Sequence, residues 1–478
     1  MIQMIKKILR QELFILVFAI ALISLLLFWK LGTNYLSNWD EAWYADISRT
    51  MAKTGNFLTP FWNKEPFFEK PPLYFWSSSL MFRLFSVSEF SVRLTSVIAA
   101  LGIALVVYFL AQQFFNKKTG LISLVILFSS IEFLYRVRTG NLDTLLTLFM
   151  TSSIFFFFKA INTDKRWFGA LGISLGLGFL SKGFIAFYPL LIILLFLSLN
   201  KKFEIFREKW FLLGILIAFG ISGGWFLLYF LANGEQFVNQ FLLANTEKFG
   251  FNQGLLNNFS IDYLGYLKNG LKIWFPLAIF SFGYLLIKIK NQVLFFLLLY
   301  LAVFLLAVSF SHEKSNWFIL PLYPILSLTT AYGILSFIEL KVKRLEILLF
   351  VVLVIIASFQ LFIYRKSYIV PNVSADEAKS ALVAKKLTKE NQPIYLTNYY
   401  YPTTVYYSQR KVYALYSDYQ DNASWWIKSK SYWPYVFRNK NIIIITTKSE
   451  LKVLKERFPR YKIDILFVTG DKVVAKKV

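Results

Sequence analysis

Long apolar runs separated by short polar connections fill the first three quarters of the chain. A helix needs about 20 mostly apolar residues to cross the hydrocarbon core of a bilayer, so apolar runs near that length are candidate membrane helices. Eleven runs predict such helices, at about residues 13–31, 94–112, 119–135, 143–160, 167–181, 183–199, 210–231, 270–287, 292–310, 317–338 and 346–364. The pattern predicts an all-α polytopic membrane domain with about eleven or more transmembrane helices.

Two connections are too long to be simple turns, namely a first outer loop at 32–93 and a second at 232–269. Apolar residues spaced four apart over 40–53 predict an amphipathic helix along the membrane surface, which Gly55 ends. The apolar stretch 73–85 is too short to span and predicts an interfacial or re-entrant helix. The long loops therefore predict juxtamembrane helices.

Residues 365–478 follow a different pattern, which is polar, rich in tyrosine and alternately helical and strand-like. Ser374 is a candidate N-cap for a helix over 375–389, with Glu377 as its capping-box partner. Strands are predicted at 393–398, 441–448, 463–468 and 472–476, and a further helix at 449–457. The chain thus divides into a transmembrane domain, 1–364, and a small α/β domain, 365–478.

Composition agrees with a membrane protein, since 57% of the residues are hydrophobic and the mean hydropathy is +0.53. The net charge is +25, but the sequence has neither the Cys/His spacing of a zinc finger nor a basic stripe with interleaved aromatic residues on a soluble domain. No nucleic-acid partner is therefore indicated. The chain has no cysteine, which excludes disulfides and thiolate chemistry.

The basic residues of the connections gather in alternate loops, beginning with the N-terminal segment. Because cytoplasmic loops are enriched in Lys and Arg, the N-terminus is predicted to be cytoplasmic. Eleven crossings of the plasma (inner) membrane then place the C-terminal domain outside. The short connections on that outer side hold only Arg136, Arg138, Lys182 and Lys314.

Carboxylates and cations gather near the predicted outer ends of the helices, where charges are costly and therefore informative. A carboxylate beside cations suits group transfer from a phosphate leaving group, because the carboxylate deprotonates the acceptor and the cations stabilise the departing phosphate. The alternative is ordinary interface charges that reach water. For Arg136 we favour that alternative.

Several motifs resemble one known family. DEAWYADISRTMAKTGNF followed by EKPPLYFW, RTGNLD at 138–143, LSKG at 180–183 and the spacing of Lys314, Pro321 and Pro324 occur in this order. Together they resemble the aminoarabinose-transferase and protein O-mannosyltransferase-like branch of integral-membrane glycosyltransferases with the GT-C fold. The resemblance covers about residues 30–340. It implies transfer of a sugar, generally with inversion, from a polyprenyl-phosphate carrier of the undecaprenyl type to a lipid such as lipid A, a glycan or a protein at the outer face.

The resemblance also implies roles for individual residues. Asp40 matches the aspartate that activates the acceptor, although an N-cap role for Asp40 alone is an alternative. Asp143 matches a second acidic position. The matched carrier-phosphate ligands are Lys70 and Lys314, with Arg138 and Lys182 as companions; Glu41 supports the loop, and Glu69 is the candidate ligand of a divalent metal. Apart from the resemblance, Tyr44 and Tyr74 are supporting residues, because aromatic side chains of the outer loops are candidate contacts of sugar or lipid.

Two positions depart from the family pattern. Asn245 stands where a histidine is expected, and amide side chains are poor zinc ligands. Phe318 stands where a tyrosine hydroxyl is expected near the phosphate. These departures leave open a non-catalytic lipid-binding relative. A transporter or flippase of a lipid-linked sugar is a further alternative, because it would also need buried basic residues. A transporter predicts charges at mid-membrane depth and paired half-repeats, and neither is visible in the sequence.

Overall fold

The computed structural model describes residues 2–249, 259–338, 343–369, 372–397, 401–416, 427–429, 432–439 and 441–478, with side chains described except at 2–12, 243–249, 343–344, 416 and 427–429. The chain forms two compact units. One comprises Met1–Leu31, Phe68–Ser77 and Arg93–Val370, and the other Gly32–Phe67, Ser78–Val92 and Pro371–Val478. Much of the first outer loop therefore groups with the C-terminal segment.

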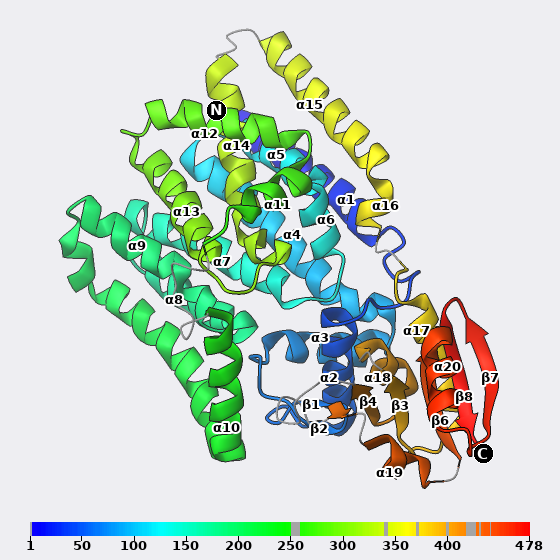
Figure 1. The fold of residues 1–478 in the computed structure, drawn as a ribbon. Helices are drawn as coiled ribbons and strands as arrows, with labels where there is room; N and C mark the ends of the chain where they lie inside the picture. Colours follow the sequence, from blue (N-terminus) through cyan, green and yellow to red (C-terminus); the bar gives the residue numbers. More distant parts are fainter. Residues whose placement is uncertain are drawn as a thin grey trace. The chain divides into compact units, whose positions relative to one another are not determined.

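Most described elements are helices (Figure 1). They are α1 (Ile2–Phe28), α2 (Asp40–Thr54), α3 (Leu73–Phe85), α4 (Glu89–Phe114), α5 (Lys117–Ser129), α6 (Ile131–Val137), α7 (Leu142–Asn162), α8 (Trp167–Lys182), α9 (Tyr188–Leu199), α10 (Lys209–Phe249), α11 (Asp262–Leu271), α12 (Trp274–Ile287), α13 (Gln292–Ser309), α14 (Tyr323–Ile338), α15 (Lys343–Ile363), α16 (Arg365–Tyr368), α17 (Ala375–Leu387), α18 (Pro402–Ser408), α19 (Trp433–Phe437) and α20 (Lys448–Arg457). Short 3-10 helices are η1 (Phe184–Phe187), η2 (Phe203–Arg207) and η5 (Asn316–Leu322).

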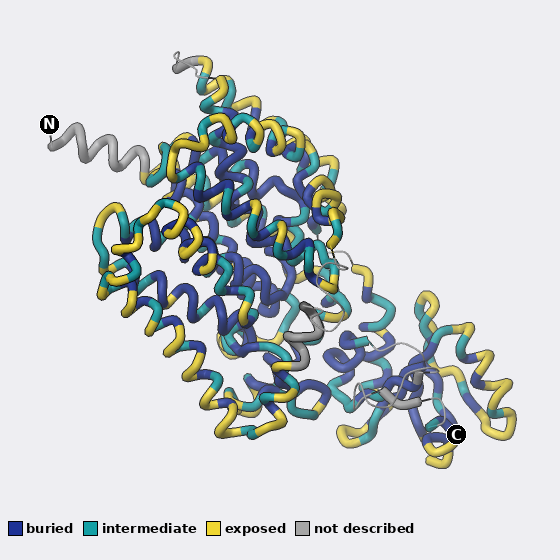
Figure 2. The backbone as a smooth tube through the Cα atoms, turned by 60° about the vertical axis from the view of Figure 1, so that its left-hand side comes forward, coloured by how far each residue is buried: buried dark blue, intermediate teal, exposed yellow. Residues whose placement is uncertain are grey.

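Within the described residues, six helices are long and apolar enough to cross a membrane, or up to eight if each of two bent pairs is one span. The prediction of a multi-pass helical membrane protein is confirmed at this level. Two of these spans, Lys209–Leu242 and Leu345–Ile363, bury only 28% and 17% of their most apolar stretches. Figure 2 shows exposed residues recurring along several helices. Apolar side chains exposed on this scale are expected to face lipid.

Two pairs of consecutive apolar helices are bent at short breaks. The predicted span 119–135 is the pair α5 and α6, bent by 77°, and the pair α11 and α12 is bent by 118°. A break frees backbone groups that lipid cannot satisfy. The buried Gln360 side chain of α15 satisfies groups at both breaks, donating to the carbonyls of Ser129 at 2.6 Å and Leu271 at 3.3 Å and accepting from the N–H of Ile273 at 2.8 Å.

Replacing Gln360 by leucine is expected to lower the free energy of unfolding by about 1–3 kcal/mol, because backbone groups at two helix breaks lose their partner. Thermal unfolding in detergent measures the change. The matched control is Phe359→Leu, since Phe359 is 58% exposed on the same helix and should leave the midpoint nearly unchanged. Equal midpoints for both variants would contradict this role of Gln360.

The second long loop begins as a continuation of helix. α10 runs to Phe249, beyond the predicted span 210–231, and bends at Gly234. Gly234 has φ 62°, in the left-handed region that favours glycine, so the sequence places the break there.

The other unit contains a six-stranded sheet in the order β5-β4-β3-β6-β8-β7. Its strands are β3 (Ile394–Thr397), β4 (Val412–Tyr416), β5 (Ile427–Ser429), β6 (Ile442–Thr447), β7 (Ile463–Thr469) and β8 (Lys472–Lys477); β1 (Phe61–Trp62) and β2 (Glu65–Pro66) form a separate hairpin. The strands β5, β4, β3 and β6 run parallel to one another, and β8 runs antiparallel to both of its neighbours, β6 and β7. The predicted strands at β3, β6, β7 and β8 and the predicted helix at α20 are confirmed. The sequence did not predict β4, β5, α18 or α19.

The predicted amphipathic helix is α2, which ends at Gly55 with φ 71°. Its apolar face is covered by protein: Ala42 and Ala45 share a core with Ala381 of α17 and Tyr406 of α18. Ile47 and Met51, whose four-residue spacing predicted the helix, are also buried within the protein. The location of this helix along the membrane surface stays a prediction.

Two hydrogen bonds, donated by Arg49 and by the N–H of Asn38, join the first outer loop to the C-terminal segment of this unit. Arg49 forms a buried ion pair with Asp46 and donates to the Tyr406 carbonyl at 2.5 Å. Ser374 precedes α17 but makes no side-chain capping bond. Its hydroxyl instead accepts from the N–H of Asn38 at 2.9 Å, so the predicted capping box is wrong.

Candidate active site

The unit that contains Arg93–Val370, called the membrane unit from here on, holds an ion pair between two of the predicted site residues. Lys182 donates to the Asp143 carboxylate, and the two side chains are 14% and 5% exposed. Lys182 also lies 5.1 Å from the centre of the Phe318 ring. The position where the family pattern expects a tyrosine is therefore in contact with this pair, and here it offers an aromatic face instead of a hydroxyl.

Local sequence explains how the pair is presented. Asn141 caps α7 by accepting from the N–H of Thr144 at 2.9 Å, which places Asp143 in the first turn, where the helix dipole favours an anion. Lys182 is the last residue of α8, and Gly183, with φ 81°, ends that helix. The dipole at a helix C-terminus favours a cation.

A second group of polar side chains joins α6 to η5. Arg136 donates through Nε to Glu132 Oε1 at 2.8 Å and through Nη2 to Asn316 Oδ1 at 2.9 Å. The Asn316 amide in turn donates to Glu132 Oε1 at 2.9 Å. The Arg136 guanidinium lies 4.6 Å from the Trp317 ring centre and within electrostatic range of Asp143. Our interpretation of Arg136 as an ordinary interface charge is therefore wrong, because a network fixes its side chain.

Lys314 precedes η5 and is partly buried. Its ammonium donates to the carbonyls of Ser309 at 2.5 Å and Ser311 at 2.6 Å. Burial lowers the pKa of Lys314, and the charge of Asp262 partly opposes that shift. Lys314, the predicted phosphate ligand, is thus held by carbonyl groups a few residues before it in the chain. Asn316, which contacts Arg136, and Phe318, which contacts Lys182, follow it closely.

Arg138 has a different environment. Its side chain is fully buried and donates to the carbonyls of Trp29 and, at 3.3 Å, Tyr368. Burial is the main cause that lowers the pKa of its guanidinium, and the charge of Arg93 adds to it. These contacts connect the end of α6 to α16 and to the residue after α1.

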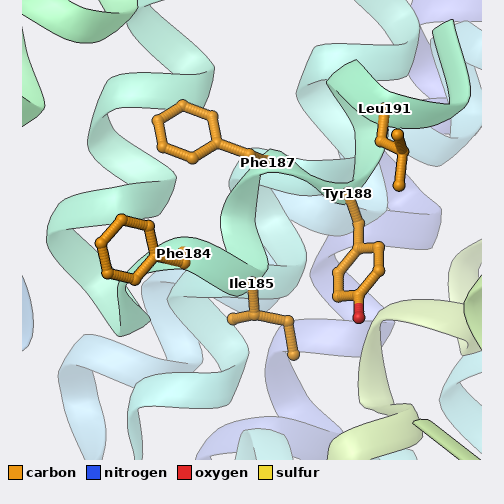
Figure 3. Close-up of a pocket in the computed structure, with 5 residues that line it drawn as sticks. All are labelled: Phe184, Ile185, Phe187, Tyr188 and Leu191. Atoms are coloured by element: carbon orange, nitrogen blue, oxygen red, sulfur yellow. The ribbon is translucent and has the colours of Figure 1, made fainter. Parts of the chain in front are cut away.

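An open apolar groove of about 200 Å³ follows Lys182 directly in the chain. Figure 3 shows the five side chains that line it, which come from η1 and the start of α9: Phe184, Ile185, Phe187, Tyr188 and Leu191. Aromatic rings of α10 continue this surface, since Phe184 lies 6.1 Å from Phe241 and Phe187 lies 5.5 Å from Phe219. The groove suits an apolar ligand.

Asp40 and Glu41 lie in the other unit, at the start of α2. The cap position is Trp39, no side chain caps this helix end, and Asp40 is half-buried. The cap-only interpretation of Asp40 is therefore not supported. Glu41 is buried and accepts from the N–H and hydroxyl of Ser37 at 2.8 and 3.0 Å, and Tyr44 is buried on the same helix.

The remaining predicted residues precede or begin α3 in the membrane unit. Glu69 and Lys70 are half-buried before Pro71, and Tyr74 is fully buried. In the described part of the chain, no group of three or more His, Asp or Glu side chains suited to a metal occurs, so Glu69 belongs to no such group there. Asn245 lies outside the residues whose side chains are described.

Sequence reasoning missed Glu132 and Asn316. A signal for Glu132 was present, because a carboxylate inside an otherwise apolar run is costly and calls for a partner. Asn316 follows Lys314 by two residues and carries no comparable signal in the sequence.

Comparison with known proteins adds an independent observation. Residues 69–225 match the family described as dolichyl-phosphate-mannose-protein mannosyltransferase. An undecaprenyl phosphate-alpha-4-amino-4-deoxy-L-arabinose arabinosyl transferase of Shewanella sediminis is 28% identical over 325 residues, which are 66% of this chain and 59% of that protein. The chain thus matches less than two thirds of that relative's length.

The fold is also shared. The structure of ArnT from Cupriavidus metallidurans bound to undecaprenyl phosphate matches with a TM-score of 0.80 at 16% identity, over 96% of this chain and 97% of that one. The resemblance to these membrane glycosyltransferases is confirmed. The archaeal oligosaccharyltransferase AglB from Archaeoglobus fulgidus, in complex with an inhibitory peptide and a dolichol-phosphate, matches with a TM-score of 0.60 at 13% identity, over 93% and 70% of the two chains. These glycosyltransferases share the fold with this chain.

Proposed function

We propose that this chain transfers a sugar from a polyprenyl-phosphate carrier of the undecaprenyl type to a hydroxyl or phosphate acceptor on a lipid, a glycan or a protein. The names of the similar proteins support a glycosyl transferase with such a donor. The shared fold supports the architecture that the activity needs. From the chain's own residues, the Asp143–Lys182 ion pair and the apolar groove at Phe184–Leu191 support it.

One observation carries the proposal. Within the family-matched segment, the Asp143–Lys182 ion pair is followed in the chain by the apolar groove at Phe184–Leu191. A lipid phosphate needs a charged contact for its head and apolar contacts for its chain. Because Gly183 alone separates Lys182 from the groove, one short stretch of chain offers both contacts.

In the proposed reaction, Asp40 takes the proton of the acceptor hydroxyl, and the acceptor oxygen bonds to the anomeric carbon of the sugar. The bond from that carbon to the phosphate oxygen breaks, and its electron pair stays on the phosphate. Lys70, Lys314 and Lys182 stabilise that charge. Asp143 holds Lys182 until the phosphate arrives. Arg138, predicted as a companion phosphate ligand, is fully buried against the carbonyls of Trp29 and Tyr368, so we assign it the support of the helix ends instead. Attack opposite the leaving group inverts the anomeric configuration.

The finer architecture is part of the proposal. Eleven apolar helices at the positions predicted from the sequence would each cross the plasma membrane, the N-terminus would be cytoplasmic, and the boundary after residue 364 would separate an outer α/β domain. The excess of basic residues in alternate connections supports this orientation.

The test is an assay with the purified protein in lipid nanodiscs and undecaprenyl phosphate carrying labelled mannose or 4-amino-4-deoxy-L-arabinose. We expect release of free undecaprenyl phosphate together with label on an added lipid or protein acceptor. Movement of intact labelled lipid across a vesicle bilayer, without release, would favour a flippase and overturn the proposal. Binding of the carrier without either event would favour a non-catalytic relative.

A further inference from the structure

The network around Arg136 has open hydrogen-bonding groups on two adjacent side chains. Glu132 Oε1 accepts from both Arg136 and Asn316, and Arg136 uses Nε and Nη2 in the network. None of the hydrogen bonds described for these two side chains uses Glu132 Oε2 or Arg136 Nη1. One acceptor, Glu132 Oε2, and one donor, Arg136 Nη1, are therefore available for a ligand. Three hydrogen bonds and the Trp317 ring hold the two side chains in place.

A buried hydroxyl beside this network is also unsatisfied. Tyr323 is 1% exposed, and its hydroxyl has no partner among the described residues. The hydroxyl lies near Gly270 and Glu132, since a Cβ added at Gly270 would meet it at 1.9 Å and would meet the Glu132 Cβ at 2.9 Å. An unsatisfied buried polar group costs about 1–3 kcal/mol. Such a cost is usually kept where a ligand or water completes the bond.

The charge of the network argues against a phosphate at this place. Glu132 and Arg136 neutralise each other, and the second carboxylate oxygen of Glu132 repels an anion. A sugar ring is neutral or carries an amine, and each hydroxyl donates and accepts at once. An indole face beside such groups is an apolar contact that suits a ring.

We propose that Glu132, Arg136 and Asn316, with Trp317 and Tyr323, form the subsite that recognises the sugar of the donor. Glu132 Oε2 accepts from a hydroxyl or amine of the sugar, Arg136 Nη1 donates to a ring hydroxyl, and Asn316 is a positioning residue that holds both. This inference rests on the proposed function. It assigns recognition of the sugar to residues that neither bind the phosphate nor act as the base in the proposed reaction.

Glu132→Gln gives a sharp test. Its oxygen must stay toward Arg136 and Asn316 to accept their bonds, so the amide nitrogen replaces the open acceptor with a donor. We expect at least a tenfold weaker affinity for undecaprenyl phosphate that carries mannose or 4-amino-4-deoxy-L-arabinose. Binding of free undecaprenyl phosphate should be unchanged or tighter, because Arg136 loses its counter-charge. The matched control is Glu346→Gln, which removes a carboxylate paired with Lys118 and should change neither affinity.

Asn316→Ala provides a second variant if Glu132→Gln does not fold. We expect it to weaken binding of the sugar-bearing carrier about tenfold and to leave binding of free undecaprenyl phosphate within twofold. Equal losses for both ligands would place the network in the phosphate site and overturn the inference, and so would no loss for either. If the unaltered protein binds neither ligand, the proposed function itself fails.

Discussion

Asp40→Asn is expected to lower the turnover of sugar transfer by about 10²- to 10⁴-fold, the usual contribution of a positioned general base. Asparagine keeps the shape of the side chain but cannot take a proton from the acceptor. The fold should survive, because no side chain caps the start of α2 and the main loss is a helix-dipole interaction of about 0.3–1 kcal/mol.

Transfer is measured as release of undecaprenyl phosphate by the purified variant, alongside thermal unfolding and binding of undecaprenyl phosphate. Binding should be unchanged, since Asp40 is not placed among the phosphate ligands. Asp471→Asn is a matched control, because Asp471 is an exposed aspartate of the β7–β8 turn. A folded Asp40→Asn protein that transfers sugar at the unaltered rate would show that another group is the base.

The second large effect is expected at the Asp143–Lys182 pair. Asp143→Asn leaves the Lys182 ammonium without its partner, and Lys182→Met leaves the carboxylate, in an environment where both side chains are at most 14% exposed. Removing one member of a buried pair typically costs about 3–5 kcal/mol. We therefore expect each single variant to unfold at a markedly lower temperature.

The double variant Asp143→Asn/Lys182→Met separates stability from function. It leaves no unpaired charge, so most of the lost stability should return. Sugar transfer should not return, because the proposed phosphate contact is absent. Additive losses of stability in the double variant would contradict a direct pair, and normal transfer by the double variant would remove Lys182 from the site.

The sequence predicted the charged residues at the proposed site better than their partners. Lys182, Lys314 and Asp143 could be singled out because charges next to long apolar runs are costly in a membrane. Their contacts could not be predicted, because the pair joins residues 39 positions apart in the chain. The Arg136 network is a stronger case, since Glu132 and Asn316 are separated by 184 positions. No local pattern encodes a contact at that separation.

By itself, the sequence determined the membrane class, the approximate positions of the long apolar helices, the amphipathic helix α2 and four strands of the C-terminal sheet. These features follow from local hydrophobic periods and from glycines such as Gly55, whose effects act within a few residues. The tertiary structure alone decided that α2 shares a core with α17 and α18, that Gln360 satisfies two helix breaks, and that Glu132 and Asn316 hold Arg136. Each of these depends on which distant segment supplies the apolar surface or hydrogen-bond partner, and that choice is made only when the whole chain packs.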